Sequence, residues 1–297
     1  MERIQNFIMR PYRTTAATCA LLLLVSLLAA CSAARLAYSN GETLTYWWLD
    51  SYVGFDSNQK SWVKKEIDDL FIWHRRKQLQ NYVQFLKRGQ SRVQAGVSET
   101  ELQNDHDEIK KHILVLADRA LPVLADLALA LHPEQIDNIK KKLASNNDKY
   151  RKDHLRGNLE KRQHSRYKKA IRQAAHWFGD FNSRQEQQIR ALSDARPLNN
   201  ELVLNDRIQR QVALIALLRD IQREKPGRNV AMTMIRSHIV AALDRSSSPE
   251  HKEFFDTFRA STIHMTAVII NSATPAQKTH FVKTTQHWID DFSALAP

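Results

Sequence analysis

The scarcity of glycine constrains the fold of this chain more than any other feature. Only seven glycines occur in 297 residues, and no two are spaced for a phosphate-binding loop or a GxSxG turn. The long segments between the glycines and prolines are rich in Leu, Ala, Lys, Arg, Glu and Gln, which favour helix. No alternating run of Val, Ile and Thr indicates a strand. We therefore predict an all-α fold: a multi-helix bundle of antiparallel helices, with long, partly projecting helices.

The first 31 residues have the organisation of an export signal. Three arginines precede an apolar run of about 13 residues, and small residues lie directly before Cys31. This run is shorter than the roughly 20 residues that a membrane-spanning helix needs. Residues 28–31, Leu-Ala-Ala-Cys, resemble the lipobox of bacterial lipoproteins. The resemblance implies cleavage between Ala30 and Cys31 and acylation of Cys31.

These features divide the chain and place it in a compartment. Residues 1–30 are predicted to be a lipoprotein signal peptide, 31–42 the lipidated cysteine with a short tether, and 43–297 a helical domain with an optional sub-boundary near 179–198. Ser32 stands where lipoproteins retained in the inner membrane carry Asp. The resemblance therefore favours the inner leaflet of the outer membrane, facing the periplasm. Because Cys19 leaves with the signal and Cys31 is acylated, no thiol remains for a disulfide or metal site.

Aromatic residues are concentrated directly after the tether. Nine of them fall between positions 38 and 73, a density well above the 8% of the whole chain. Leu44, Trp48, Tyr52 and Phe55 recur at helical spacing, so one interpretation is a stripe buried in the core. The alternative is that Trp47 and its neighbours rest at the lipid interface beside the anchor, where amphipathic rings are favoured.

The same region carries a resemblance to a known family. An amphipathic helix is predicted from residue 57 to about residue 89, and it contains Trp73-His74-Arg75-Arg76. With residues 47–52 and 55–60, this motif resembles a family of uncharacterised proteobacterial lipoproteins that is defined only as a domain of unknown function. Membership implies a lipid-anchored helical protein and supplies no activity. Residues 56–57, Asp-Ser, stand where the family pattern leads us to expect Thr-Pro.

One short pattern recurs at five predicted helix starts. A capping residue is followed three positions later by Gln or His, in the pairs Asp56/Gln59, His132/Gln135, Asn182/Gln185, Ser248/His251 and Thr274/Gln277. The first side chain can accept from exposed helix amides, and the second can return a hydrogen bond. The spacing between starts is uneven, so the pattern is not a fixed-period solenoid. Ser98 with Glu101 adds a further capping box and opens a helix through Leu131, which Pro122 should kink or break.

This pattern also resembles the LTxxQ motif of the Spy and CpxP family of periplasmic chaperones and stress sensors. The resemblance implies an antiparallel helical cradle that holds unfolded or envelope proteins. Phe55 and Phe181, which directly precede two of the caps, favour it. Ordinary helix capping explains the same residues without a function. Both interpretations stay open at the level of sequence.

Residues 140–172 form a basic segment, in which 13 Lys or Arg stand against three acidic residues. One interpretation is a solvated face, with a helix that projects from the core. The alternative is contact with anionic lipid headgroups, lipopolysaccharide or cell-wall polymers. The contact residues would then be Lys140, Lys141, Lys142, Lys168 and Lys169. Nucleic acid is disfavoured as a partner because of the predicted compartment.

No sequence pattern predicts catalysis or a metal site. The chain has 12 His, but neither HExxH nor the ExxH of di-iron bundles occurs. His74 is predicted to be a core histidine with a satisfied partner, and Glu108 with His112 a contact on one helix face. We predict no cofactor and no enzymatic activity, and expect binding: chaperone-like or scaffolding contact with envelope proteins first, polyanion or lipopolysaccharide binding as the alternative. A third hypothesis is an enzyme whose site is assembled from distant helices.

Overall fold

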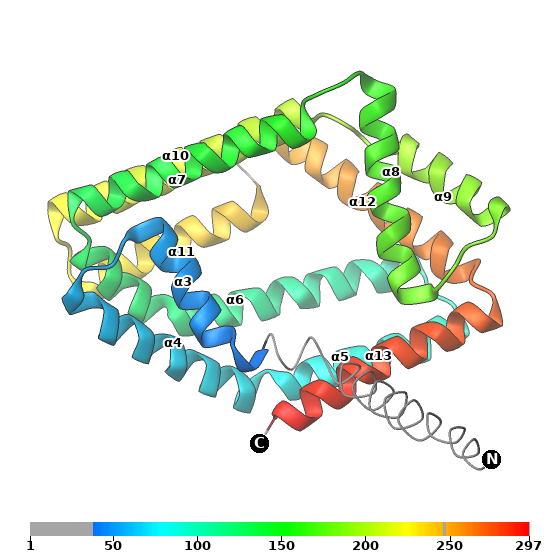
Figure 1. The fold of residues 1–297 in the computed structure, drawn as a ribbon, viewed down its shortest axis with the longest axis horizontal. Coiled ribbons are helices and arrows are strands. Elements are labelled where there is room, and N and C mark those ends of the chain that lie inside the picture. Colours follow the sequence, from blue (N-terminus) through cyan, green and yellow to red (C-terminus); the bar gives the residue numbers. More distant parts are fainter. Residues whose placement is uncertain (1–37, 246–247, 297) are drawn as a thin grey trace, which may run out of the picture.

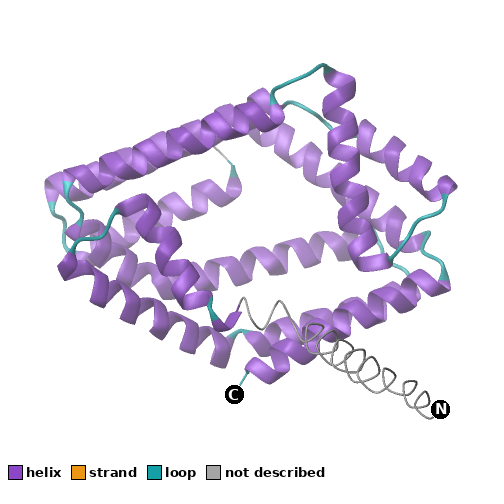
Figure 2. Ribbon diagram, in the orientation of Figure 1, coloured by secondary structure: helices purple, strands orange, loops and turns teal. Residues whose placement is uncertain are grey.

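A computed structural model describes residues 38–245 and 248–296 (Figure 1). Within these ranges the chain forms eleven helices and no strand, which confirms the predicted all-α class (Figure 2). The helices make an elongated frame. Helices α7 and α10 run side by side along one long edge, and α5 and α13 run together along the opposite edge. Ala30 and Cys31, with the predicted signal peptide, lie outside the described residues.

The helices have lengths of 13 to 32 residues and follow one another with short connections. They are α3 (Gly41–Val53), α4 (Ser57–Lys77), α5 (Leu79–Ala95), α6 (Glu99–Ala130), α7 (Pro133–His154), α8 (Leu159–Phe178), α9 (Ser183–Ala195), α10 (Asn200–Glu224), α11 (Arg228–Asp244), α12 (Pro249–Asn271) and α13 (Pro275–Leu295). Each of the six predicted caps is the residue directly before a helix, so the capping pattern located these starts correctly.

Three sequence predictions about helix continuity are corrected. The helix predicted from residue 57 to 89 is two helices, interrupted at the buried Gln78. Pro122 does not break α6, because Leu121, Ala125 and Ala128 on both sides of it are buried against α10 and α11. The basic segment is not one projecting helix: it is divided between α7 and α8, and α7 packs along α10.

The stripe predicted to be buried along α3 is also wrong in part. Phe55 is buried at 4% exposure, but Leu44 and Trp48 are exposed, and the residues that α3 buries are Tyr46 and Val53. At about 100° per residue, positions 46 and 53 point in the same direction, whereas 44 and 48 point to the opposite side. In the first two turns of α3, the face predicted to be buried is therefore exposed, and the opposite face is buried.

Two helix junctions of the same design stabilise the frame. The first brings the turn between α3 and α4 to the turn between α6 and α7, where Gln59 and Gln135 meet. The second brings the turn between α8 and α9 to the turn between α12 and α13, where Gln185 and Gln277 meet. In each junction, one of the two turns starts with a glycine that has a positive φ angle. Gly54 (φ 69°) starts the turn before Gln59, and Gly179 (φ 75°) starts the turn before Gln185. A side chain there would be strained, so glycine is required.

Most of the buried apolar residues fall into three separate clusters. One cluster surrounds the first junction and includes Phe55, Val63 and Ile136. Another surrounds the second junction and includes Phe178 and Ile189. The third lies where α6 meets α10 and α11. Because the clusters are separate, the edges of the frame between them consist of paired helices. Side chains on the face of a helix pair that points into the frame can therefore stay only partly buried.

Candidate functional site: an apolar groove between α5, α6 and α13

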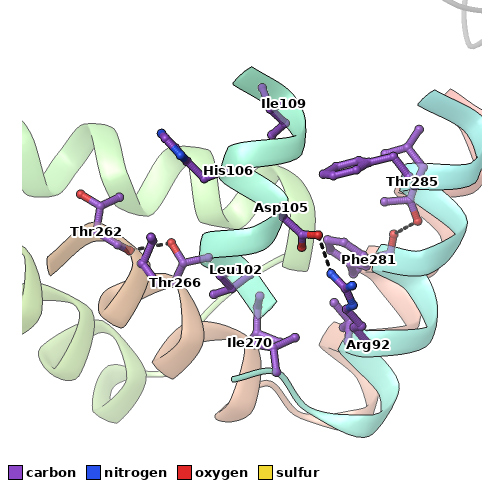
Figure 3. Close-up of a pocket in the computed structure, with 16 residues that line it drawn as sticks. Arg92, Leu102, Asp105, His106, Ile109, Thr262, Thr266, Ile270, Phe281 and Thr285 are labelled. Carbon is purple, nitrogen blue, oxygen red and sulfur yellow. Dashed lines mark hydrogen bonds and ion pairs between the residues drawn. The ribbon is translucent and has the colours of Figure 1, made fainter. Parts of the chain in front are cut away.

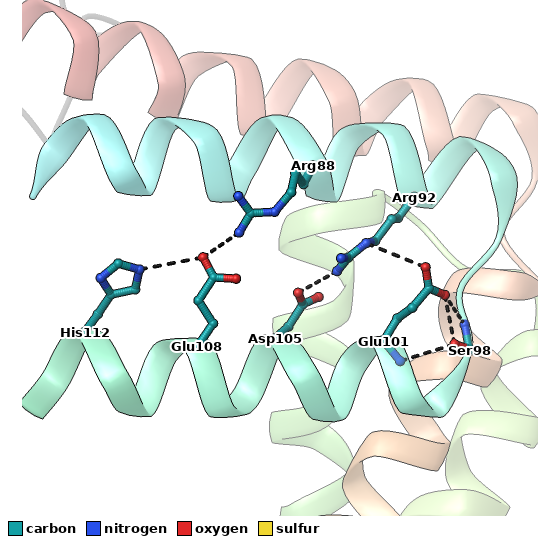
Figure 4. Close-up of polar contacts among 7 residues, drawn as sticks. All are labelled: Arg88, Arg92, Ser98, Glu101, Asp105, Glu108 and His112. Atoms are coloured by element: carbon teal, nitrogen blue, oxygen red, sulfur yellow. Dashed lines mark hydrogen bonds and ion pairs between the residues drawn. The ribbon is translucent and has the colours of Figure 1, made fainter.

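Helices α5 and α6 form an antiparallel hairpin whose facing sides are linked by a ladder of ion pairs (Figure 4). Arg92 Nη1 donates to Asp105 Oδ1 at 2.5 Å, and Arg88 Nη2 donates to Glu108 Oε1 at 2.5 Å. His112 Nε2 lies 3.7 Å from the same Glu108 oxygen. The predicted contact between Glu108 and His112 on one helix face is therefore confirmed.

The ladder changes the ionisation of its members in the direction expected of ion pairs. The hydrogen bond from Arg88 lowers the pKa of the Glu108 carboxyl. The bond to Asp105 raises the pKa of the Arg92 guanidinium. At the start of α6, the Ser98 amide donates to Glu101 at 2.8 Å, and this bond lowers the pKa of Glu101. For Glu108, Arg92 and Glu101, each of these shifts favours the charged form.

An apolar groove lies beside this ladder, with α13 as a further wall. It consists of two adjoining cavities of about 340 and 390 Å³, which share the lining residues Phe85, Leu86 and Ile109. The first extends to α12 and includes Ile270 and Phe281, as Figure 3 shows. The remaining apolar residues of the second are Ile113, Leu116, Trp177, Trp288 and Phe292. We call this feature the α5–α6 groove.

The polar side chains that line the groove already have partners within the protein. Thr262 donates to the Phe258 carbonyl at 2.7 Å. Thr266 donates to the Thr262 carbonyl at 2.8 Å (Figure 3). Thr285 donates to the Phe281 carbonyl at 2.8 Å. Asp105 is held by Arg92, and the ring of the exposed His106 lies 3.1 Å from Asp107. What these walls offer a ligand is therefore mainly aliphatic and aromatic surface.

A chain of aromatic residues extends from one wall of the groove. Tyr82 lines the second cavity, and its hydroxyl lies 3.2 Å from His74 Nε2. On the other side of the imidazole, the Tyr38 hydroxyl lies 2.6 Å from Nδ1. Burial, with a smaller effect of Arg75, lowers the pKa of His74, and burial raises the pKa of Tyr38 to about 12. His74 is thus a half-buried histidine with two partners, as predicted from sequence.

The predicted anionic contact residues are not brought together in one cluster. Lys140 and Lys141 are exposed on α7, and Lys168 and Lys169 are exposed on α8. At 1.5 Å per residue, Lys140 lies about 21 Å before the end of α7, so the two sets flank a corner of the frame. Lys142 is only partly exposed, with its ammonium 5.7 Å from the centre of the Tyr52 ring on α3.

Sequence reasoning missed the groove, although part of its pattern is local. On α5 the arginines stand four apart, and on α6 Glu101, Asp105, Glu108 and His112 recur every three or four positions, which puts each set on one helix face. Because only the short 96–98 turn separates the two segments, matching the basic face with the acidic face would have predicted the hairpin. The wall from α13 carries no such signal, because it lies about 195 positions away in sequence.

Comparison with known proteins places the chain in a family. Residues 51–237 match the model of a family described as "Family of unknown function (DUF6279)". The chain belongs to this family. The matched region contains both helices of the ion-pair ladder and ends within α11, so the α12 and α13 walls of the groove lie outside it. Neither the curated proteins nor the solved structures gave a significant match.

Two further observations concern metal and membrane. In the part of the chain that the structure describes, no group of three or more His, Cys, Asp or Glu side chains could hold a metal ion. Of the helices in residues 38–245 and 248–296, none combines the length and the apolar character needed to cross a bilayer.

Proposed function

We propose that this protein is a lipid-anchored protein of the bacterial envelope that acts by binding, and that the α5–α6 groove holds apolar segments of unfolded envelope proteins. The groove carries this proposal, because its walls are apolar and its polar groups are already paired. The acylated Cys31 would hold the protein on the inner leaflet of the outer membrane, facing the periplasm. The resemblance of the capping pattern to the LTxxQ motif supports the same chaperone-like role.

Exposure along α6 explains how an extended or helical segment could enter. Ile109 is 47% exposed and Ile113 is 44% exposed, although both line the cavities. One side of the groove is therefore open to solvent. Each apolar side chain that a client buries there gains about 25 cal/mol per Å² removed from water.

The test is suppression of aggregation of a reduced, unfolded client by the full chain in lipid nanodiscs. We expect wild-type protein to suppress light scattering, and Ile109→Asp and Ile113→Asp to reduce suppression several-fold, because a carboxylate in the groove must be desolvated when a client binds. Val212→Asp is the matched control, since Val212 on α10 is 64% exposed and does not line the groove. Equal suppression by all four proteins would contradict the assignment of the groove.

A second candidate function is binding of a polyanion, such as lipopolysaccharide, by the basic segment. It is favoured by one observation: Lys140, Lys141, Lys168 and Lys169 are exposed, and within the described residues none of them forms an ion pair with a carboxylate. Exposed and unpaired cations attract phosphate-rich surfaces at long range. The two candidates use different faces, so variants of one should leave the other unchanged.

A further inference from the structure

Helix α3 has an apolar face that its own helix partners do not cover. Leu44 is 50% exposed, Trp47 63% and Trp48 59%. With the exposed Ser51, these residues recur at positions 0, 3, 4 and 7, so they occupy one side of the helix. The opposite side, with Tyr46 and Val53, is buried against α4 and α7. We call the exposed residues Leu44, Trp47 and Trp48 the α3 stripe.

One cationic side chain lies beside this stripe. The Lys142 ammonium of α7 lies 5.7 Å from the centre of the Tyr52 ring, and that ring lies 5.1 Å from the Trp48 ring. The Lys64 ammonium of α4 does not border the stripe, because it lies 4.7 Å from the centre of the Tyr46 ring on the opposite, buried side of α3. Exposed indole rings with a lysine nearby are typical of the boundary between lipid headgroups and acyl chains.

The two acidic residues of α3 are already engaged away from the stripe. Glu42 accepts from Arg75 at 2.5 Å, and Asp50 accepts from the Phe55 amide at 2.7 Å. Neither carboxylate therefore needs to be desolvated when the stripe is covered. A surface that combines apolar depth with negative charge matches this arrangement better than a neutral or cationic one.

The position of α3 in the chain is consistent with a lipid surface. Leu44 lies roughly 13 residues after Cys31, and a chain of that length reaches at most about 45 Å. If Cys31 is acylated, as the proposed function holds, α3 stays within this distance of the bilayer. In Figure 1 it begins close to the point where the described chain starts.

We propose that the α3 stripe rests on the surface of an anionic bilayer, with Trp47 and Trp48 at the level of the acyl-chain boundary and Lys142 among the headgroup phosphates. This contact fixes how the protein stands on the membrane, whereas the acyl chains only hold it nearby. The orientation deepens the proposed envelope function, and it is independent of whether the α5–α6 groove binds clients.

The experiment uses the full chain reconstituted in vesicles of phosphatidylcholine and phosphatidylglycerol that contain acyl-brominated phosphatidylcholine. Bromine quenches indoles that reach the acyl chains. We expect strong quenching of wild-type fluorescence, and loss of at least half of it in Trp47→Ala/Trp48→Ala. Leu44→Asp keeps all six tryptophans and should also lower quenching, because its carboxylate is repelled by the anionic surface. Lys142→Gln should lower quenching in these vesicles and not in phosphatidylcholine alone.

Trp177→Phe/Trp288→Phe is the matched control, because these indoles line the α5–α6 groove. If this variant loses the quenching and Trp47→Ala/Trp48→Ala keeps it, lipid enters the groove and the proposal is wrong. Equal quenching in wild type and Trp47→Ala/Trp48→Ala would also overturn it. The client assay keeps the two proposals apart, since the α3 variants should suppress aggregation as well as wild type does.

Discussion

Gln59 and Gln135, which lie 76 positions apart, exchange hydrogen bonds between their buried side-chain amides. Gln59 Nε2 also donates to the Ala130 carbonyl, and Gln135 Nε2 to the Gly54 carbonyl, each two residues before the cap of the other helix. Each Oε1 additionally accepts from the amide of its own cap residue. Every donor and acceptor of the two amides is therefore used, which is what burial of such groups requires.

Gln185 and Gln277 repeat this arrangement bond for bond. Their amides exchange hydrogen bonds at 2.9 and 3.2 Å, and they donate to the carbonyls of Ser272 and Asp180, again two residues before the caps. Four of the five recurrences of the capping pattern thus form two pairs. The fifth differs, because the buried His251 lies 3.8 Å from Asp206 instead. The pattern marks helix starts and also specifies which starts are joined.

The junctions give a prediction about stability. Gln185→Ala should lower the free energy of unfolding by about 1 to 3 kcal/mol, because the buried amide of Gln277 loses the two hydrogen bonds that it exchanges with Gln185. Gln187→Ala, an exposed position on the same helix, is the control and should cost a few tenths of a kcal/mol at most. Denaturant titration followed by circular dichroism measures both. A loss at Gln185 no larger than at Gln187 would mean that the paired amides do not stabilise the junction.

The double-mutant cycle of the first junction tests the pairing itself. Removing Gln59 and Gln135 together should cost less than the sum of the two single changes, since each single change already breaks both bonds between the amides. Additive costs would show that the two side chains act only as separate helix caps.

The capping pattern shows how far sequence alone could lead. The starts at Ser57, Ser183 and Pro275 followed from it, because a cap and its third residue interact within one turn. The pairing of these starts did not follow, since it depends on contacts 76 and 92 positions apart. The failure at Gln78 is of the same kind: nothing local ends the helix there, and the break lets α5 run along α13.

The face of α3 illustrates the opposite error. Leu44, Trp48 and Phe55 fit a helical stripe, and the rule that large apolar residues are buried suggested a core position for all three. Only Phe55 is buried, because α4 and α7 cover the side of α3 that carries Tyr46. Periodicity gives the existence of a face, but which face is covered depends on the neighbours. An exposed stripe of this kind is more informative than a buried one.

His74 gives a prediction about pH. Its pKa is lowered from 6.5 by burial and by Arg75, so the unfolded chain takes up a proton at higher pH than the folded protein does. The contribution of the neutral His74 to stability is therefore fully present above about pH 6.5, and it decreases as the pH falls towards the pKa of His74 in the folded protein. His74→Asn should make the free energy of unfolding depend less on pH between pH 7 and pH 5.5. The exposed His287→Asn on α13 is the control and should keep the wild-type slope.

Lipidation concerns residues outside the described part of the chain. Cys31→Ser should leave an uncleaved or soluble form and abolish labelling with a palmitate analogue, because a hydroxyl cannot replace the thiol that is acylated. The serine variant should still fold, since the helical domain needs no thiol. Metabolic labelling and membrane fractionation measure the result. Labelling that survives the substitution would contradict the anchor while leaving the assignment of the groove untouched.

The basic segment gives the last prediction. Changing Lys140, Lys141, Lys168 and Lys169 to Gln should alter stability little, because the four ammonium groups are exposed and make no ion pair within the described residues. Adding Lys142→Gln should cost more than Lys140→Gln or Lys141→Gln, since it removes the contact with the Tyr52 ring. Thermal unfolding of the fourfold and fivefold variants separates these effects.

The same fourfold variant decides between a contact surface and a solvated face. If the segment binds lipopolysaccharide, wild-type binding should fall steeply with added salt, because exposed charges are screened over about 8 Å at physiological ionic strength. The fourfold variant should then bind several-fold more weakly, while client aggregation is still suppressed. Lys64, outside the segment, provides the control: Lys64→Gln should leave lipopolysaccharide binding unchanged. Binding that ignores both salt and the four lysines would make the segment a solvated face, and the α5–α6 groove would then be the stronger of the two candidate sites.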